Sequence, residues 1–188
     1  QNRVNAGRKI DPADRISAEG KRVAVIGGGD TGSDCVGVAR RQGAREVVQL
    51  EILPEPPAGR TPACPWPNWP NILRTSSSHE EGCDRRWSVL TRKLVGANNH
   101  VTELHGVEVE WSAGRASPGG SPPFVEKPGS EFVLGTDLVL IAMGFMHVTP
   151  TGLVEELGLA RDARGNLRTT DWMTSESGVF AAGDAVSG

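Results

Sequence analysis

The stretch that decides the fold is Arg22-Val-Ala-Val-Ile-Gly-Gly-Gly-Asp-Thr-Gly32, in which an apolar, β-branched segment runs directly into spaced glycines. A G-x-G-x-x-G pattern between a strand and a helix is typical of a dinucleotide-binding turn. Gly27 permits the tight turn, Gly29 lets the backbone approach a pyrophosphate, and Gly32 allows close packing of helix on strand. The N–H groups and the dipole at the start of the helix then favour a phosphate.

A helix and a second strand are predicted directly after this turn. Small and apolar residues recur at helical spacing and define one buried face: Gly32, Cys35, Val36 and Ala39. Gly43 is placed to end the helix, and the β-branched segment 46–50 follows as a strand. The resulting β-α-β unit favours an α/β fold with a Rossmann-like parallel sheet. The competing interpretation is a structural turn that binds no phosphate.

The acid Glu51 closes the second strand, 19 residues beyond Gly32. Dinucleotide-binding folds carry a carboxylate about 20 residues after the glycines, where it bonds the adenosine ribose hydroxyls. A carboxylate there repels the additional phosphate of NADPH, so Glu51 favours NADH. Arg60 and Arg74 lie farther along the chain and would reverse this preference by folding over the adenosine.

Gly28, Asp30 and Thr31 complete the glycine turn and belong to the same predicted cofactor site. A bare carboxylate at Asp30 would repel a pyrophosphate, so we expect Asp30 to cap the helix by bonding backbone N–H groups. The histidines are interpreted as structural, because none has a Cys, Ser or Asp partner at a recognisable spacing. They are His79, His100, His105 and His147.

Composition excludes several classes of function. The net charge of −3, without a basic stripe, gives no general attraction for nucleic acid or an anionic membrane surface. No apolar run approaches the roughly 20 residues of a transmembrane helix, and the first residues are too polar for a signal peptide. Cys35, Cys64 and Cys83 form neither a C-x-x-C pair nor a disulfide framework. We therefore predict no metal site and a reducing, cytoplasmic setting.

Proline and tryptophan mark an insertion after the second strand. Seven of the 13 prolines lie between Pro54 and Pro70, a density that favours extended backbone over helix or central strand. Trp66 and Trp69 lie within this insertion. We expect both tryptophans to pin the loop onto its own domain, the alternative being that they stack on a ligand or a partner.

Beyond the insertion the pattern predicts strands. Segments 88–95, 100–111 and 132–134 indicate an antiparallel β-meander inserted into the parallel sheet. Segment 137–142 is almost entirely apolar, which predicts a strand buried on both faces. It ends before Gly144, at the edge where open α/β sheets hold ligands. A short helix over 151–157 and a further buried strand over 178–184 complete the prediction.

The glycine turn, together with the segment Gly178-Val-Phe-Ala-Ala-Gly-Asp184, resembles the two-dinucleotide-domain flavoprotein reductases. Within that group the chain is most similar to the small (beta) subunits of glutamate synthases. The closer likeness is carried by GGGDTGSDCVG (27–37), LEILPEPP (50–57), PWPNWP (65–70) and LVLIAMGF (138–145). The proline–tryptophan segment is far more specific than the glycines, and the resemblance covers nearly the whole chain.

The resemblance implies a division into domains. Residues 22–145 correspond to an inserted NAD(P)H-binding domain, 1–21 to a connector from an FAD-binding domain, and 146–188 to the chain's return into that domain. Gly183 and Asp184 match the family's second FAD motif, in which a carboxylate accepts a hydrogen bond from a ribityl hydroxyl. The family's first FAD fingerprint and its iron–sulfur cysteine segments are absent from this sequence. We therefore expect missing FAD and iron–sulfur portions on a longer subunit.

The resemblance also implies an activity. An NAD(P)H-dependent flavin oxidoreductase of the glutamate synthase type passes hydride to FAD, and iron–sulfur clusters carry the electrons to a large subunit. That large subunit makes glutamate from glutamine and 2-oxoglutarate. Cofactor-to-cofactor hydride transfer depends on distance and stacking, so we predict no catalytic side chain and an isolated chain without turnover. The alternatives are a non-catalytic dinucleotide-binding module, another FAD-dependent NAD(P)H:acceptor reductase, and a scaffold around the Trp-Pro segment.

Overall fold

The computed structural model describes residues 5–11, 15–62, 64–67, 72–112 and 124–187. Trp69 and Pro70 of the proline–tryptophan segment lie outside these residues. The chain forms two compact units, Gln1–Met143 and Gly144–Gly188, and each is described by itself. None of the described helices is long and apolar enough to cross a membrane.

A parallel sheet forms the centre of the first unit, as the sequence predicts. Its strands are β1 (Arg22–Ile26), β2 (Glu46–Leu50), β3 (Asp84–Arg86) and β8 (Leu138–Ile141). Their order is β3-β2-β1-β8, with β1 and β2 at the centre. The charged strand β3 was not predicted, since three residues are too few to show an alternating pattern.

An antiparallel sheet is inserted between β3 and β8 and confirms the predicted meander. It consists of β4 (Val89–Ala97), β5 (His100–Trp111), β6 (Phe124–Glu126) and β7 (Phe132–Gly135). The long strand β5 pairs with β4 and also with β6 and β7. Asn98 and Asn99 join β4 to β5 with φ of +51° and +63°, the left-handed pair that a two-residue hairpin turn requires.

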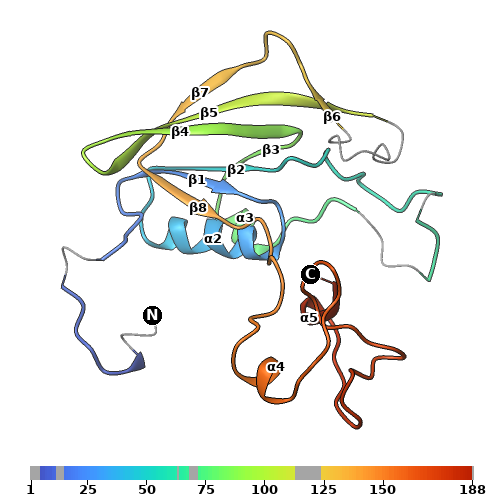
Figure 1. Ribbon diagram of the computed structural model, residues 1–188. Helices are drawn as coiled ribbons and strands as arrows, with labels where there is room; N and C mark the ends of the chain where they lie inside the picture. The colour runs from blue at the N-terminus through green and yellow to red at the C-terminus, as the bar shows by residue number, and fades with distance from the viewer. Residues whose placement is uncertain (1–4, 12–14, 63, 68–71, 113–123, 188) are drawn as a thin grey trace. The chain divides into compact units, whose positions relative to one another are not determined.

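The parallel sheet has a different cover on each face (Figure 1). Helix α2 (Asp30–Arg41) packs Val36 and Ala39 against Val23 and Val25, which point to one face of β1. Ala24 points to the other face, where it packs with Leu50 and with residues of the antiparallel sheet. Alternation along β1 thus serves two cores at once, and this explains why the strand is apolar throughout.

Strand β8 is less buried than its apolar sequence predicts. Ile141 is 67% exposed, and the other residues of the strand are half-buried. Because β8 ends the order of the described sheet, only β1 pairs with it there. Arg22 and Asp137 hold the starts of β1 and β8 together: the Arg22 Nη2 lies 2.7 Å from Asp137 Oδ1, and the Arg22 backbone N–H donates to Oδ2 at 2.9 Å.

Among its described residues, the second unit contains only short helices and isolated β-bridges. Helix α4 (Leu153–Glu156) lies within the predicted helix. The predicted buried strand over 178–184 is wrong: Phe180 forms one isolated bridge with Met173 and is exposed, and Asp184 begins helix α5 (Asp184–Ser187). An apolar segment becomes a strand only where a neighbouring strand completes its hydrogen bonds, and the described unit offers a single bridge there.

Candidate functional site

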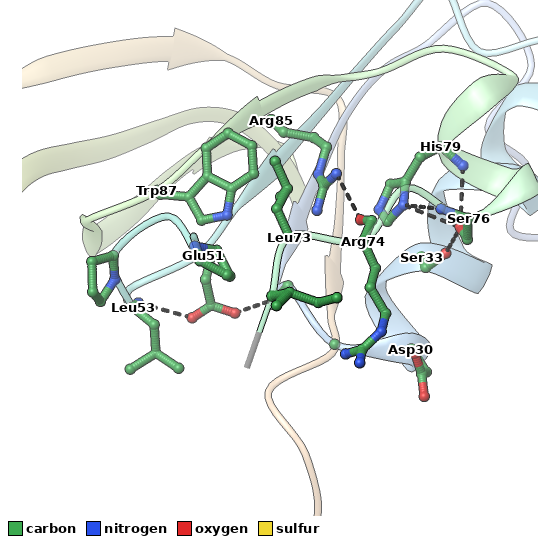
Figure 2. A pocket seen from close by; sticks show the side chains of 15 residues that line it. Asp30, Ser33, Glu51, Leu53, Leu73, Arg74, Ser76, His79, Arg85 and Trp87 are labelled. Atoms are coloured by element: carbon green, nitrogen blue, oxygen red, sulfur yellow. Dashed lines mark hydrogen bonds between the residues drawn. The ribbon is translucent and has the colours of Figure 1, made fainter. Parts of the chain in front are cut away.

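A cavity of about 590 Å³ opens in the first unit beside the carboxyl ends of the parallel strands. The predicted cofactor residues Gly28, Gly29, Asp30 and Glu51 line it (Figure 2). This is the edge of an open α/β sheet that holds ligands. The volume lies within the range of about 300–1,000 Å³ that small-molecule sites span.

Gly27 and Gly32 lie behind the cavity wall and fix the path of the turn. Gly27 has φ of +123°, and a Cβ built there would lie 2.0 Å from the Ala142 carbonyl oxygen. A Cβ on Gly32 would lie 2.1 Å from the Gly27 carbonyl oxygen. Both contacts are with backbone, which cannot move aside as a flexible side chain can. Gly29 differs, because a Cβ there meets no atom within 4 Å and its backbone faces open space.

The Glu51 carboxylate is held directly against the glycine turn. Its Oε2 accepts a hydrogen bond from the Gly28 backbone N–H at 2.6 Å, and its Oε1 accepts one from the Leu53 N–H at 3.0 Å. Both bonds lock the carboxylate in one orientation at the cavity wall. The sequence predicts an acid at this position, but not that the turn itself would hold it.

Asp30 does not cap helix α2, so that prediction is wrong. The N-cap position belongs to Gly29, with φ of −78° and ψ of −173°, and Asp30 is the first helical residue. The turn ends one residue earlier than the capping argument assumed. Asp30 lines the cavity, where an acid in the first turn suits the helix dipole, and Thr31 beside it is exposed.

Cationic and aromatic side chains from a later part of the chain form a second part of the cavity wall. Arg74, Arg85 and Trp87 line the cavity, and the Arg85 guanidinium lies 4.9 Å from the centre of the Trp87 ring. Arg85 also donates to the Arg74 carbonyl oxygen at 3.1 Å. Sequence reasoning named Arg74 but missed Arg85 and Trp87, because strand β3 was not recognised. Arg60, the other arginine named, donates to the Cys64 carbonyl oxygen at 3.0 Å.

His79 joins this wall from helix α3 (Ser77–Glu80), whose N-cap is Ser76. Its Nδ1 lies 3.2 Å from the Ser76 backbone nitrogen, and its Nε2 lies 2.9 Å from Gln49 Oε1. Burial is the larger cause of a lowered pKa of the imidazole, and the charge of Arg85 lowers this pKa further. In the sequence, this arrangement could have been predicted only from the Ser76-x-x-His79 spacing, which is that of a capping box.

The tryptophan that pins the loop after β2 is Trp111, which was not predicted. Its indole Nε1–H donates to the Ile52 carbonyl oxygen at 2.8 Å. Trp66 is 81% exposed, so the prediction that it pins the loop is wrong, and Trp69 lies outside the described residues. A long strand places Trp111 beside a segment that is far away in sequence, and no local pattern carries that information.

The remaining predicted cofactor residues, Gly144, Gly183 and Asp184, belong to the second unit. Gly144 and Gly183 have φ of +88° and +65°, and a Cβ on either would meet no atom within 4 Å. The side chain of Asp184 is exposed. Within the described part of the chain, no group of three His, Cys, Asp or Glu side chains is placed to hold a metal ion.

The first unit therefore has the features that a dinucleotide diphosphate requires. Gly29 leaves room for a close approach, the N-terminus of the 12-residue helix α2 faces the cavity through Gly29 and Asp30, and a fixed carboxylate lies one strand away. Apolar and aromatic surface from Leu53 and Trp87 suits a planar base. The residues present thus fit an adenine-linked diphosphate.

Comparison with known proteins agrees with this arrangement. The small chain of glutamate synthase [NADPH] from Mycobacterium tuberculosis is 45% identical over 187 residues, which cover 97% of this chain and 37% of that protein. The corresponding chain of Bacillus subtilis is 39% identical over 181 residues, covering 92% of this chain and 36% of that protein. Glutamate synthase [NADH] of Saccharomyces cerevisiae is 37% identical over 185 residues, or 93% of this chain and 8% of that protein. The chain thus spans little more than a third of the bacterial relatives.

The fold has solved counterparts. Thioredoxin reductase of T. acidophilum matches with a TM-score of 0.58 at 22% identity, covering 90% of this chain and 46% of that one. At this identity the likeness concerns the fold alone. The sequence profile described as pyridine nucleotide-disulphide oxidoreductase matches residues 1–188. The resemblance inferred from the motifs is confirmed, and the chain belongs to the pyridine nucleotide-disulphide oxidoreductase family.

Proposed function

We propose that this chain binds NAD(P)H in the cavity of its first unit and serves a flavoprotein oxidoreductase of the glutamate synthase type. One observation carries the proposal: the glycine turn, the first turn of α2 and the Glu51 carboxylate line one cavity at the carboxyl edge of a parallel sheet. The relatives that are glutamate synthases by name support the choice of enzyme type.

Each wall of the cavity has a defined part in binding. The diphosphate lies at the N-terminus of α2, against the backbone of Gly29, where the N–H groups of the first turn and the helix dipole offset its charge while the Gly28 N–H stays bonded to Glu51. Glu51 accepts the ribose hydroxyls while Gly28 and Leu53 hold it in place. Trp87 and Leu53 cover the base and exclude water from it.

The chemistry supplied on binding is hydride donation from the nicotinamide to the flavin of the complete protein. This chain's residues orient the coenzyme and take no proton, so we name no catalytic side chain. In the complete protein, iron–sulfur clusters held by other sequence would carry the electrons to a large subunit that would form glutamate from glutamine and 2-oxoglutarate. The cytoplasm is the compartment that supplies these substrates and keeps Cys35, Cys64 and Cys83 reduced.

We assign residues 22–145 to NAD(P)H binding, 1–21 to a connector and 146–188 to part of an FAD-binding domain. Gly183 and Asp184 then contribute one edge of the FAD site, with the Asp184 carboxylate accepting from a ribityl hydroxyl. The exposed position of Asp184 at the start of α5 is consistent with that role. The bacterial relatives are nearly three times as long as this chain, which leaves the remainder of the flavin site to other sequence.

Titration of the chain with NADH by calorimetry tests the proposal. We expect Glu51→Gln to weaken NADH binding about 10-fold, because a neutral amide replaces a charged acceptor of the ribose hydroxyls. The variant amide still offers an oxygen to the Gly28 N–H, so the turn is retained. Glu55→Gln, an exposed acid four residues farther on, is the matched control and leaves the affinity unchanged. Absence of heat with both NADH and NADPH in a folded chain would refute nucleotide binding.

Coenzyme preference depends on opposing charges in the same cavity. Glu51 favours NADH, whereas Arg74 and Arg85 line the same cavity and suit the additional phosphate of NADPH. Glu51 is fixed by two hydrogen bonds at the predicted ribose position, so we propose NADH as the better ligand. Equal or tighter binding of NADPH would overturn this preference and assign the selectivity to the arginines.

A further inference from the structure

A buried amide connects the glycine turn to helix α3. Gln49 lies on β2 next to the cavity, and its side chain is 2% exposed. Its Nε2 lies 2.9 Å from the Gly27 carbonyl oxygen, and its Oε1 lies 2.9 Å from the His79 Nε2. The Gln49 side chain thus connects Gly27 of the turn to His79, which lies 30 positions after Gln49 in the sequence.

The hydrogen bonds fix the tautomer of His79. A backbone N–H can only donate, so the Ser76 N–H, 3.2 Å away, makes His79 Nδ1 an acceptor. The ring proton of the neutral imidazole then lies on Nε2 and is donated to Gln49 Oε1. This leaves the Gln49 amide nitrogen to donate to the Gly27 carbonyl oxygen. Three bonds therefore run in one direction: Ser76 to His79, His79 to Gln49, and Gln49 to Gly27.

The Gly27 carbonyl is a sensitive point in the turn. A Cβ on Gly32 would overlap with it, and the Gln49 Nε2 lies 2.7 Å from the same Cβ position. The peptide that follows this carbonyl carries the Gly28 N–H, which bonds Glu51 at 2.6 Å. Rotation of the Gly27–Gly28 peptide would move both the carbonyl and that N–H. The Gln49 bond opposes this rotation.

We propose that His79 is a positioning residue for the dinucleotide: in its neutral form, protonated on Nε2, it holds the Gly27–Gly28 peptide in binding orientation through Gln49. This rests on the proposed nucleotide site. An imidazolium carries a proton on Nδ1 as well, which opposes the Ser76 N–H and must turn toward the Ser76 hydroxyl, 3.1 Å from Nδ1, as its acceptor. This turn of the ring weakens the bond from Nε2 to Gln49, so coenzyme affinity falls as His79 becomes protonated.

The charges around His79 favour the neutral ring at pH 7. Burial and the cationic Arg85 of β3 lower its pKa below the ordinary histidine value of about 6.5. Four other charged residues lie near His79. Arg74 and Asp30 line the same cavity, Glu80 is on helix α3, and Glu81 directly follows that helix. Glu81 is paired with Arg41 of α2. His79 therefore becomes protonated at a lower pH than an ordinary histidine, and we expect the loss of coenzyme affinity only at acidic pH.

Two substitutions separate the proposed role from a merely structural one. In His79→Gln the amide nitrogen takes the place of Nε2 and still donates to Gln49, but it does not titrate. In His79→Asn the side-chain oxygen takes the place of Nδ1 and still accepts from Ser76, but the donor to Gln49 is gone. We expect His79→Gln to keep NADH affinity within about 3-fold and His79→Asn to lose about 10-fold at pH 7.

The pH profile of the dissociation constant gives the decisive readout. The wild-type chain should bind NADH more weakly as the pH falls from 7.5 to about 5, and His79→Gln should lose this dependence. Equal losses in the two variants, or the same acid-side loss in His79→Gln, would overturn the proposal. The Gly28 amide resonance, followed by NMR without coenzyme, should shift with His79 titration in the wild type and not in His79→Gln. An unchanged resonance overturns the inference even if no coenzyme binds, whereas a shift without binding overturns the proposed function alone.

Discussion

The two compact units differ in how much of their apolar surface they bury by themselves. In the first unit, valines and leucines of the parallel sheet lie in two cores, one under α2 and one under the antiparallel sheet. In the second, Leu159 and Leu167 are buried, while Phe145, Trp172 and Phe180 are exposed. The first unit therefore buries the apolar side chains of its central strands, although Ile141 of β8 stays exposed, and the second unit leaves more of its large apolar side chains without a core.

The difference lies in the strands that each unit contains. Every strand of the first unit pairs with another described strand, and the central strands β1 and β2 have a core on each face. The second unit has isolated bridges, such as Met173 with Phe180, and short helices. Apolar residues without a second layer remain in solvent whatever their sequence pattern.

The largest effect should come from removing a core side chain of the first unit. Leu104 of β5 is fully buried in the core under the antiparallel sheet, so Leu104→Ala should lower the free energy of unfolding by about 2–5 kcal/mol. The matched change in the second unit is Leu153→Ala, at a leucine that is 67% exposed. It should change the stability by less than about 0.5 kcal/mol. Urea unfolding followed by circular dichroism measures both, and equal losses would break the contrast.

A smaller effect on stability, with a large effect on binding, should follow from Gly32→Ala. The new Cβ would meet the Gly27 carbonyl oxygen, so helix α2 and the turn must separate. We expect a loss of about 1–3 kcal/mol and NADH binding weakened by more than about 10-fold. Gly59→Ala is the matched control, because a Cβ there meets no atom within 4 Å. Unchanged NADH binding in Gly32→Ala would separate the turn from the coenzyme site.

The smallest effect should come from Asp137→Asn, which removes the ion pair between the starts of β1 and β8. The Arg22 hydrogen bonds hold the pKa of the Asp137 carboxyl well below its ordinary value, so the charged form stabilises the fold near pH 7. That contribution is lost progressively as the pH falls below the ordinary aspartate pKa. The pair is partly exposed, so we expect Tm to fall by about 2–3 °C at pH 7. The difference between variant and wild type should shrink toward pH 3.

Thermal unfolding at the two pH values measures this difference. Asp34→Asn, at an exposed aspartate of α2, serves as the control and should leave Tm unchanged at both. A difference that grows toward acid would contradict the role given to the ion pair. The coenzyme cavity lies at the opposite ends of the strands, so NADH affinity should be the same in Asp137→Asn as in the wild type.

Much of the first unit was predictable because its signals are local. The sequence from Arg22 to Ala39 combines strand composition, glycines that backbone contacts require, and a helix with one face of small and apolar residues. Strands β4, β5 and β7 of the antiparallel sheet were predicted for the same reason, since alternation and turn residues lie within a few positions of each other, whereas the three-residue strand β6 was not predicted. Glu51 was placed by counting along the chain.

The other wall of the site was not predictable in this way. Arg85 belongs to a strand too short to show a pattern, and Trp87 directly follows that strand. His79 reaches the turn through the buried Gln49. Trp111 holds the loop after β2 from the end of another sheet. In the second unit the apolar segment before Asp184 indicated a strand, and the described unit supplies no ladder to complete it.

The sequence by itself determined the α/β class, the glycine turn and the acid that faces it, because each depends on backbone geometry within a few residues or a fixed count along one β-α-β unit. Tertiary structure alone decided which side chains share the cavity with that turn, and which apolar segment gains a neighbouring strand to pair with. Those outcomes depend on contacts between residues distant in sequence, and neither residue of such a pair carries a local sign of the other.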